Sequence, residues 1–378
     1  MDRYTLLQEC DQAVSELLAD LPRPEQKSVA ALLEGIVVER TAVLSRAAAA
    51  APGEATDRSK QRRAQRLLAN PRFDAPRAQR RLLRRILAHP RPRLDLLIDA
   101  ITVGSTTTQP GTQTVCLALA WHGRALPVLW RSWQADEPGQ HWMEAITTLC
   151  QILADELPPQ VTVVVLADRG LGGERLATIA TGFGWSYLLR VQGHGFIRTA
   201  AGWTGPVRAL VPTPGSQALG AGVQIWPADH KVRLGQRVTS YLDWEHCSTA
   251  NVVAVWRMED TEPWLLVTNL PASLQRCREY RRRTWEEELF RDLQSFGWQW
   301  HQSRVRRPER VERLLVLLAL ATLWVCCTSQ RVLRRGQRWL LEERSRRCYS
   351  RFQLGLRWIH RQLANGQPVA CLLALWRE

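Results

Sequence analysis

Residues 280–295, YRRRTWEEELFRDLQS, form the stretch on which the interpretation of the whole chain depends. With a turn of about 100° per residue, this stretch predicts one amphipathic helix. The residues expected to face a core are Trp285, Leu289, Leu293 and Phe296. The residues expected on the opposite, polar arc are Tyr280, Arg283, Glu287, Arg291 and Gln294. A carboxylate between an aromatic hydroxyl and two guanidiniums indicates a site for an anion or a metal ion, although a solvated face with Glu–Arg pairs has the same composition.

Two further acids stand at the ends of apolar runs. Asp99 closes the run LDLLIDA, and Asp168 follows VTVVVLA. Short, nearly unbroken apolar runs predict buried strands, and α/β sheets expose their chemistry at the carboxyl ends of such strands. Carboxylates suit Mg²⁺ or Mn²⁺, and two such ions support in-line phosphoryl transfer. We therefore expect Asp99, Asp168 and Glu287 to be both the catalytic residues and the ligands of two divalent ions.

These three contexts resemble the DDE transposases of bacterial insertion sequences, in the group whose third block has the pattern Tyr-x2-Arg-x3-Glu-x6-Lys. Tyr280, Arg283 and Glu287 match this pattern, and Gln294 stands where the family has lysine. The stretches LLIDAITV, ADRG, LLVTNL and PERVERLLVLLALATLW also resemble family blocks, in the same order. The resemblance covers most of residues 94–330.

The resemblance implies a transposase that binds the inverted-repeat ends of an insertion sequence and catalyses metal-dependent strand cleavage and strand transfer. Its partners would be double-stranded DNA, both element ends and target, and a second copy of the chain in a homodimeric complex. Tyr280 and Arg283 would bind the phosphate of the transferred end. Because Gln294 replaces the expected lysine, Arg291 on the same face is a candidate for that phosphate contact.

The charge of the chain also indicates a nucleic-acid partner. The net charge is +15 and the pI is near 10.2. The densest basic run spans Arg58–Arg93 and predicts one or two basic amphipathic helices that bind DNA phosphates, with contacts from Arg62, Arg63 and Arg66. A solvated arginine face packed on the catalytic domain is the alternative. A second basic segment, residues 297–310, also suits contact with a DNA end.

The order of predicted elements is that of an α/β fold. Three strands, a helix, a strand, a helix and a strand follow one another between residues 94 and 191, and the resemblance selects an RNase H-like fold among the mixed sheets that this order permits. The expected organisation is an all-helical DNA-binding domain at 1–92, the first part of the RNase H-like catalytic domain at 93–190, a β-rich insertion at 191–265, the second part of the catalytic domain with the Glu287 helix at 266–330, and a helical C-terminal region at 331–378.

Three other features of the sequence bear on membrane contact, cellular location and base stacking. The one long apolar run, Leu314–Cys327, is too short to span a bilayer and predicts a buried core helix, so no membrane partner is expected. The nine cysteines lack metal-ligand spacing, which is typical of a reducing bacterial cytoplasm, where the protein would act at the nucleoid. Trp203, Trp226 and Trp244 in the β-rich insertion are candidates for stacking on bases, with core packing as the alternative.

Two other functions remain open from the sequence. The first is a metal-dependent nuclease on the same fold that only hydrolyses DNA. The second is an inactive, repurposed DNA-binding protein, which Gln294 in place of lysine would favour and the intact set of three acids disfavours.

Overall fold

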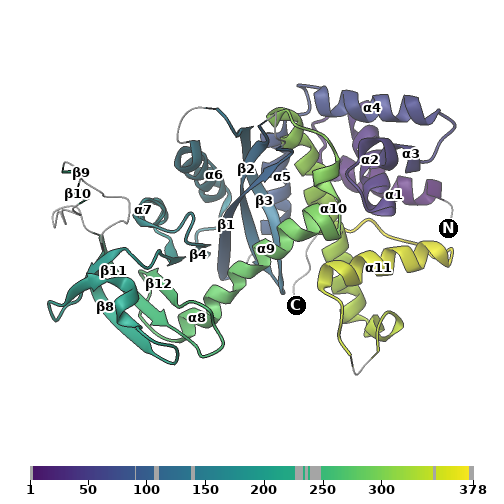
Figure 1. The fold of residues 1–378 in the computed structure, drawn as a ribbon. Coiled ribbons are helices and arrows are strands. Elements are labelled where there is room, and N and C mark those ends of the chain that lie inside the picture. Colours follow the sequence, from purple (N-terminus) through teal and green to yellow (C-terminus); the bar gives the residue numbers. More distant parts are fainter. Residues whose placement is uncertain are drawn as a thin grey trace. The chain divides into compact units, whose positions relative to one another are not determined.

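The computed structural model describes residues 3–89, 91–105, 110–137, 141–225, 233–234, 237–238, 248–343 and 346–373. The chain divides into two compact units. Unit 1 comprises Met1–Arg91, Ala100–Pro159 and Trp285–Glu378, and unit 2 comprises Pro92–Asp99 and Gln160–Thr284. The fold is mixed α/β, with most of the helices in unit 1 and a mixed sheet in unit 2 (Figure 1).

The amino-terminal part of unit 1 is helical. Its helices are α1 (Arg3–Leu17), α2 (Arg23–Glu39), α3 (Leu44–Ala50), α4 (Asp57–Ala69) and α5 (Ala75–Leu87). The predicted basic stretch thus forms two helices, α4 and α5. Each begins with a side-chain cap, because the Thr56 hydroxyl accepts a hydrogen bond from the Ser59 backbone N–H and the Asp74 carboxylate accepts one from that of Arg77.

A β-hairpin and a helix continue unit 1. Strands β2 (Thr112–Trp121) and β3 (Arg124–Gln134) pair antiparallel through a two-residue turn. Both turn residues, His122 and Gly123, have positive φ angles of 47° and 83°. A turn with two positive φ angles matches the right-handed twist of the paired strands. Helix α6 (His141–Glu156) packs against both strands.

A long apolar helix, α10 (Pro308–Arg334), forms the core of unit 1. It packs against α2, α4, α5, β3 and α11 (Arg351–Ala364). Figure 1 shows α10 running beside the amino-terminal helices and α11. Pro308 occupies its first turn, as helix-start prolines do. Within the described ranges it is the one helix long and apolar enough to cross a membrane, yet 94% of that apolar window is buried in the protein. The prediction of a buried core helix is confirmed.

Unit 2 is built on one mixed sheet. Its strands are the first part of β1 (Arg93–Val103), β4 (Thr162–Ala167), β5 (Ser186–Arg190), β6 (Phe196–Arg198), β7 (Thr204–Pro206), β8 (Gln217–Ile225), β11 (Ser248–Val255) and β12 (Trp264–Thr268). They lie in the order β1-β4-β5-β12-β11-β8-β6-β7. The β1–β4 and β4–β5 pairs are parallel and the remaining pairs are antiparallel. Helix α7 (Glu174–Gly182) connects β4 to β5, as parallel strands require.

The predicted β-rich segment 191–265 extends this sheet. Strand β12 pairs directly with β5, and β11, β8, β6 and β7 follow outward. A separate pair, β9 (Arg233–Leu234) with β10 (Arg237–Val238), belongs to the same segment. Trp203 is 42% exposed and is therefore not a core residue. Trp226 and Trp244 lie outside the described residues.

The 280–295 stretch is helical, but it is not one regular helix. It consists of the end of α8 (Gln275–Tyr280), a 3₁₀ turn (Arg281–Arg283), α9 (Thr284–Arg291) and a π-helical turn (Asp292–Phe296). Leu289 and Leu293 are buried as predicted, but Phe296 is 66% exposed, so its predicted core position is wrong. The tight and wide turns change the rotation per residue, and a constant 100° step misplaces residues beyond them.

The carboxyl-terminal region contains a second correction. A helix expected over residues 331–347 ends at Arg334, where α10 stops. Gly336 has a φ of 65°, a left-handed conformation that glycine adopts readily after a helix. A single 3₁₀ turn, Gln337–Leu340, is the only helical element that the described residues form before α11 begins at Arg351.

Candidate functional site

Asp99 and Asp168 lie on two neighbouring parallel strands of unit 2. In the β1–β4 register Ile98 is paired with Ala167. Asp99 and Asp168 are the residues that directly follow this last pair. Asp168 follows the end of β4, as predicted. Asp99 differs slightly from the prediction, because β1 continues to Val103 and only its pairing with β4 ends at Ile98. Both side chains therefore lie at the carboxyl edge of the parallel part of the sheet.

The turn after β4 fixes the orientation of the Asp168 carboxylate. Its Oδ1 accepts hydrogen bonds from the backbone N–H groups of Gly170 (2.8 Å) and Leu171 (3.3 Å). The turn is closed by the Gly172 N–H, which donates to the Asp168 carbonyl oxygen at 2.5 Å. A Cβ atom at Gly172 would lie 2.1 Å from the Arg190 carbonyl oxygen, so only glycine fits there. One carboxylate oxygen is thus held by the backbone while the other, Oδ2, points elsewhere.

Arg283 joins the two carboxylates. Its Nη2 lies 2.6 Å from Asp99 Oδ2 and 3.3 Å from Asp168 Oδ2. The Arg283 side chain is 8% exposed, against 17% for Asp99 and 35% for Asp168. Two carboxylates this close repel each other, and a buried guanidinium between them offsets that repulsion. The arrangement shows that this edge of the sheet accommodates a cationic centre shared by both acids.

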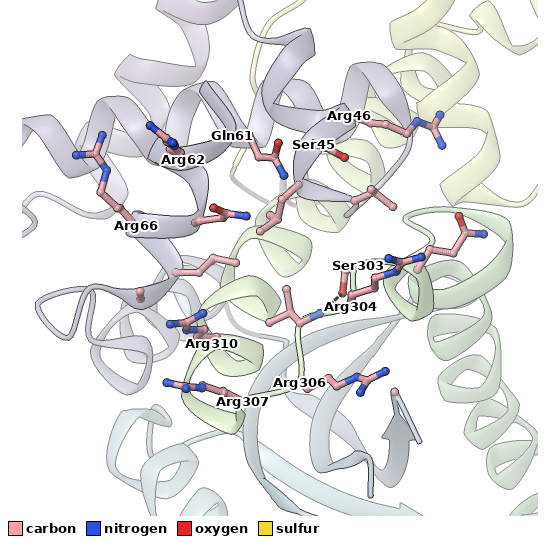
Figure 2. Close-up of a pocket in the computed structure, with 18 of the residues that line it drawn as sticks. Ser45, Arg46, Gln61, Arg62, Arg66, Ser303, Arg304, Arg306, Arg307 and Arg310 are labelled. Atoms are coloured by element: carbon pink, nitrogen blue, oxygen red, sulfur yellow. Dashed lines mark hydrogen bonds between the residues drawn. The ribbon is translucent and has the colours of Figure 1, made fainter. Parts of the chain in front are cut away.

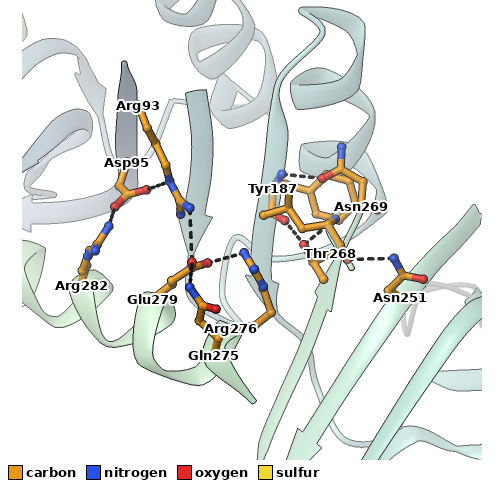
Figure 3. Close-up of polar contacts among 11 residues, drawn as sticks. Arg93, Asp95, Tyr187, Asn251, Thr268, Asn269, Gln275, Arg276, Glu279 and Arg282 are labelled. Carbon is orange, nitrogen blue, oxygen red and sulfur yellow. Dashed lines mark hydrogen bonds and ion pairs between the residues drawn. The ribbon is translucent and has the colours of Figure 1, made fainter. Parts of the chain in front are cut away.

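A network of ion pairs fastens the segment that carries Arg283 to β1 (Figure 3). Arg93 on β1 lies 2.9 Å from Asp95 and 3.3 Å from Glu279 on α8. Arg282 reaches back to the same Asp95 carboxylate. Asp95 and Glu279 are nearly buried, so these pairs are less screened by solvent than surface pairs. The network therefore positions Arg283, the residue that follows Arg282, against the strand that carries Asp99.

Tyr280 is part of the same framework. Its side chain is 4% exposed, and its hydroxyl donates a hydrogen bond to the Ala167 carbonyl oxygen at 3.3 Å. Its ring meets that of Trp264 edge to face, with 5.5 Å between the ring centroids. In this structure Tyr280 therefore braces the end of β4, next to Asp168.

The remaining predicted residues of the polar arc belong to unit 1. Glu287 and Arg291 are exposed on α9, and Gln294 is half-buried in the π-helical turn. Arg291 Nη1 donates to Glu288 Oε1 at 2.9 Å. Glu288 also accepts a hydrogen bond from Arg124 at 2.9 Å. The structure thus groups Asp99 and Asp168 with Arg283 and Tyr280 in unit 2, and places Glu287, Arg291 and Gln294 in the other unit.

Burial also perturbs an acid near this part of α9. The carboxyl of Asp292 is 5% exposed, and burial raises its pKa to about 7 although the nearby Arg124 guanidinium lowers it. Arg124 lies 3.8 Å from Asp292 and was not identified from the sequence. It begins β3 directly after the hairpin turn and links that strand to α9 and the π-helical turn.

The donor atoms at the sheet edge suit a hard divalent cation. In the described ranges no group of three or more His, Cys, Asp or Glu side chains is placed to hold a metal ion. Asp99 and Asp168 nevertheless present two carboxylates to one positively charged group, the Arg283 guanidinium. Carboxylate oxygens are the ligands that Mg²⁺ and Mn²⁺ prefer, so this pair of residues fits such an ion.

Unit 1 contains a second candidate site, a basic cleft of about 1710 Å³. The arginines that line it are Arg46, Arg58, Arg62, Arg66, Arg304, Arg306, Arg307 and Arg310. Figure 2 shows Arg62 and Arg66 on one side of the cleft and Arg307 and Arg310 on the other. Arg63, which the sequence grouped with them, is exposed on α4 but does not line the cleft.

The comparisons with known proteins bear on both sites. Residues 144–324 match the family model described as a transposase DDE domain. This match supports a DDE transposase of the insertion-sequence type. No curated protein is similar enough in sequence to count as a relative. A solved structure of endonuclease V from Bacillus subtilis aligns with 69% of this chain and 92% of its own, with 13% identity and a TM-score of 0.24, a likeness too low to carry an argument.

As a transposase, the protein acts on DNA and is an enzyme that cleaves or transfers DNA strands. The matched residues include Asp168, Arg283 and Glu287 and begin after Asp99. The family match does not assign roles to individual residues. Those assignments depend on the chemistry of the sites described above.

The second wall of the basic cleft belongs to segment 297–310, which the sequence predicted to contact a DNA end without naming its individual arginines. The signal was present as R-x-R-R-P-x-R at residues 304–310, immediately before and within the first turn of α10. Trp298 and Trp300, which belong to the longer basic segment 297–310, are buried, with exposed fractions of 0% and 1%. The segment therefore offers arginines, and not these rings, to a ligand.

Proposed function

We propose that this transposase binds the inverted-repeat ends of an insertion sequence and catalyses metal-dependent strand cleavage and strand transfer, with Asp99, Asp168 and Glu287 as catalytic carboxylates. The observation that supports this most strongly is the shared Arg283 guanidinium, which brings two carboxylates to one point at the carboxyl edge of parallel strands. Carboxylates gathered at such an edge are typical of phosphoryl-transfer sites.

The proposed metal ligands are Asp99, Asp168 and Glu287, and the proposed cofactor is a pair of Mg²⁺ or Mn²⁺ ions. Bound there, two divalent ions supply activation of the attacking oxygen and stabilisation of the leaving oxygen. The chain itself contributes orientation. The backbone N–H groups of Gly170 and Leu171 hold Asp168 Oδ1, which leaves Oδ2 directed toward the position that Arg283 occupies.

Arg283 has two proposed roles. Without DNA, its guanidinium contacts both aspartates and holds them together. With DNA, a guanidinium at this position binds a phosphate of the transferred end, with Tyr280 beside it. Arg291 and Gln294 are proposed as further phosphate contacts, and Arg291 would take the place of the family's lysine.

The proposed partners are double-stranded DNA, as element ends and target, and a second copy of the chain in a homodimer. Arg62, Arg63 and Arg66 of α4 are proposed DNA contacts. The strand and helix order β1, β2, β3, α6, β4, α7, β5 supports an RNase H-like catalytic domain at 93–190 and 266–330, interrupted by the β-rich insertion at 191–265. An all-helical DNA-binding domain at 1–92 and a helical C-terminal region at 331–378 complete this proposed organisation. The proposed place of action of the protein is the bacterial nucleoid.

A cleavage assay tests this function. The substrate is a supercoiled plasmid that contains the coding region and its flanking DNA, incubated with and without Mg²⁺. Wild-type protein is expected to cut at the element boundary only with the ion, and Asp99→Ala, Asp168→Ala and Glu287→Gln are expected to lower the rate by roughly a thousandfold or more. Glu288→Gln is the matched control, because it lies beside Glu287 and its amide oxygen still accepts from Arg124.

A second assay separates the proposed function from the two alternatives. Flanking-end duplexes with free 3′ hydroxyls are incubated with a target plasmid and Mg²⁺. Covalent joining to the target supports the transposase, whereas cutting without joining would indicate a nuclease. Binding without any metal-dependent cutting, unaltered by Asp99→Ala, would indicate an inactive DNA-binding protein.

A further inference from the structure

The basic cleft of unit 1 has two walls that come from distant parts of the sequence. One wall is the face of α4 that carries Arg58, Arg62 and Arg66, spaced four residues apart. Successive residues at this spacing lie about 6 Å apart along a helix axis and close to one face. The other wall is the segment that carries Arg304, Arg306, Arg307 and Arg310 (Figure 2).

Most of this positive charge is uncompensated. In the part of the chain that the structure describes, none of the following arginines has an ion pair with a carboxylate: Arg58, Arg62, Arg66, Arg304, Arg307 and Arg310. No aspartate or glutamate of the described residues lines the cleft. Like charges gathered in one cleft repel one another, and a small anion neutralises only one or two of them. A polyanion neutralises all of them.

The backbone of the second wall is held by hydrogen bonds. The carbonyl oxygen of Arg306 accepts hydrogen bonds from the Thr112 hydroxyl and, at 3.3 Å, from the Gln134 side-chain amide. These partners lie on the β2–β3 hairpin. The loop is therefore held in place while Arg304 and Arg307 stay exposed.

Arg313 of α10 holds the first wall next to the second. Its guanidinium donates to the backbone carbonyl oxygens of Leu68, in α4, and Phe73, each at 2.8 Å. Arg313 thus ties the carboxyl end of α4 to the first turns of α10. These turns contain Arg310, the last residue of the arginine segment. Both walls are positioned before any ligand binds, which lowers the cost of binding.

We propose that this cleft is a composite binding site for the sugar-phosphate backbone of double-stranded DNA, held between α4 and residues 304–310. The inference deepens the proposed function by locating a duplex-binding surface outside the carboxylate site. A duplex is favoured over a single strand because sites for single strands use aromatic rings as stacking platforms. Apart from His301, no aromatic residue of the described chain lines the cleft.

Fluorescence anisotropy with a labelled random-sequence duplex tests the first wall, with Kd measured across a salt series. The α4-wall variant is Arg58→Ala, Arg62→Ala, Arg66→Ala. We expect its Kd to rise roughly tenfold to a hundredfold and its salt slope to fall by about three, because each lost phosphate contact releases about one fewer counterion. The lysine version of the same three substitutions retains the charge and is expected to restore the slope, which separates a charge effect from misfolding.

The second wall is tested in the same way. The segment variant is Arg304→Ala, Arg307→Ala, Arg310→Ala, and we expect a loss of similar size. A matched control removes three arginines of α5 that already have carboxylate partners: Arg77→Ala, Arg81→Ala, Arg84→Ala. The proposal is overturned if both wall variants keep the wild-type slope, if the α5 control loses as much affinity as they do, or if a labelled single strand of the same length binds more tightly than the duplex.

The outcome is separable from that of the proposed catalytic function. The catalytic function has its own readout, the metal-dependent cleavage that Asp99→Ala is expected to abolish, and Asp99 does not line the cleft. If the wall variants bind normally and Asp99→Ala abolishes cleavage, the cleft assignment alone fails. If the wall variants lose binding and wild-type protein never cuts with Mg²⁺, the catalytic function alone fails.

Discussion

Helices α4 and α5 have the same length and the same number of basic side chains, but they differ in how many of these side chains have carboxylate partners. Each spans 13 residues and carries five basic side chains. Those of α5 all have carboxylate partners: Arg77 and Arg81 with Asp20, Arg80 with Asp155 and Glu156, Arg84 with Glu156, and Arg85 with Glu16. The α4 arginines have none among the described residues, and three of them line the basic cleft.

The contrast shows that a run of arginines acquires its role from the surfaces packed against it. α5 lies against α1 and α6, which supply acids, whereas α4 faces a loop that supplies more arginines. The Arg84–Glu156 pair is bidentate, with distances of 2.6 and 2.8 Å. The predicted basic run at 58–93 therefore contains both a packed arginine face on α5 and, on α4, the proposed DNA-binding surface, which were weighed as alternatives for the whole run.

Reversing charge on α4 should give the largest effect. Arg62→Glu with Arg66→Glu removes two proposed phosphate contacts and adds two repulsive ones, so Kd for a random duplex should rise by roughly a hundredfold or more at moderate salt. The measurement is anisotropy with circular dichroism as a check on folding. The matched reversal on α5, Arg80→Glu with Arg84→Glu, should change Kd less. Equal losses from the two reversals would mean that the helices do not differ in function.

Releasing the α5 arginines should give an intermediate effect in the opposite direction. Asp20→Asn with Glu156→Gln removes the carboxylate partners of Arg77, Arg81 and Arg84, and one of the two partners of Arg80, while keeping the shape of each side chain. We expect nonspecific duplex affinity to increase several-fold and the salt slope to steepen. An unchanged slope would show that α5 cannot reach DNA for steric reasons. The ion pairs with Asp20 and Glu156 would then not be the reason why α5 does not bind DNA.

Much of the framework was predictable because local patterns determine it. Asp168 follows a buried apolar run, and the His122–Gly123 turn is encoded in two residues. Phe296 was misplaced because a π-helical turn shifts the helix phase, and single-sequence periodicity has no means of sensing it. Arg283 was a candidate from the sequence, but its contacts with two aspartates were not predicted, because these partners lie more than a hundred residues away in the chain.

The basic cleft shows a different limit of sequence reasoning. Arg62, Arg63 and Arg66 look equivalent in the sequence, but helix geometry turns only Arg62 and Arg66 toward residues 304–310. Whether an arginine is neutralised depends on acids such as Asp20 and Glu156, which tertiary packing brings to α5. Local composition carries no information about such distant partners.

A pH series should sharpen the comparison with a smaller effect. The hydrogen bond from Arg84 lowers the pKa of Glu156 below its ordinary 4.5, so the carboxylate stays ionised through neutral and mildly acidic pH. Its contribution to stability is present above about pH 4.5 and is lost as pH falls through the lowered pKa. In His301→Ala, which lacks the histidine that lines the cleft, the duplex salt slope should therefore be constant from about pH 5.5 to 8.

Thermal unfolding measured from pH 3 to 8 checks the stability part of this expectation. The wild-type Tm should fall below about pH 4.5, and Glu156→Gln should lose less over that interval because it has no proton to take up. A salt slope of His301→Ala that steepens between pH 8 and 5.5 would contradict the assignment, since it would indicate that α5 arginines are released while Glu156 is still ionised.

The smallest expected effect separates two neighbours on the same helix. Arg62 lines the cleft, whereas Arg63 is equally exposed to solvent but does not line it. Arg63→Ala should change Kd for duplex DNA by less than about twofold and leave the salt slope unchanged, and Arg62→Ala should weaken binding by roughly threefold to tenfold and lower the slope by about one. Both substitutions remove one positive charge and install a good helix former, so net charge and helix propensity are matched. Identical results would mean that α4 binds DNA through its overall charge, and the cleft geometry would then have no role in binding.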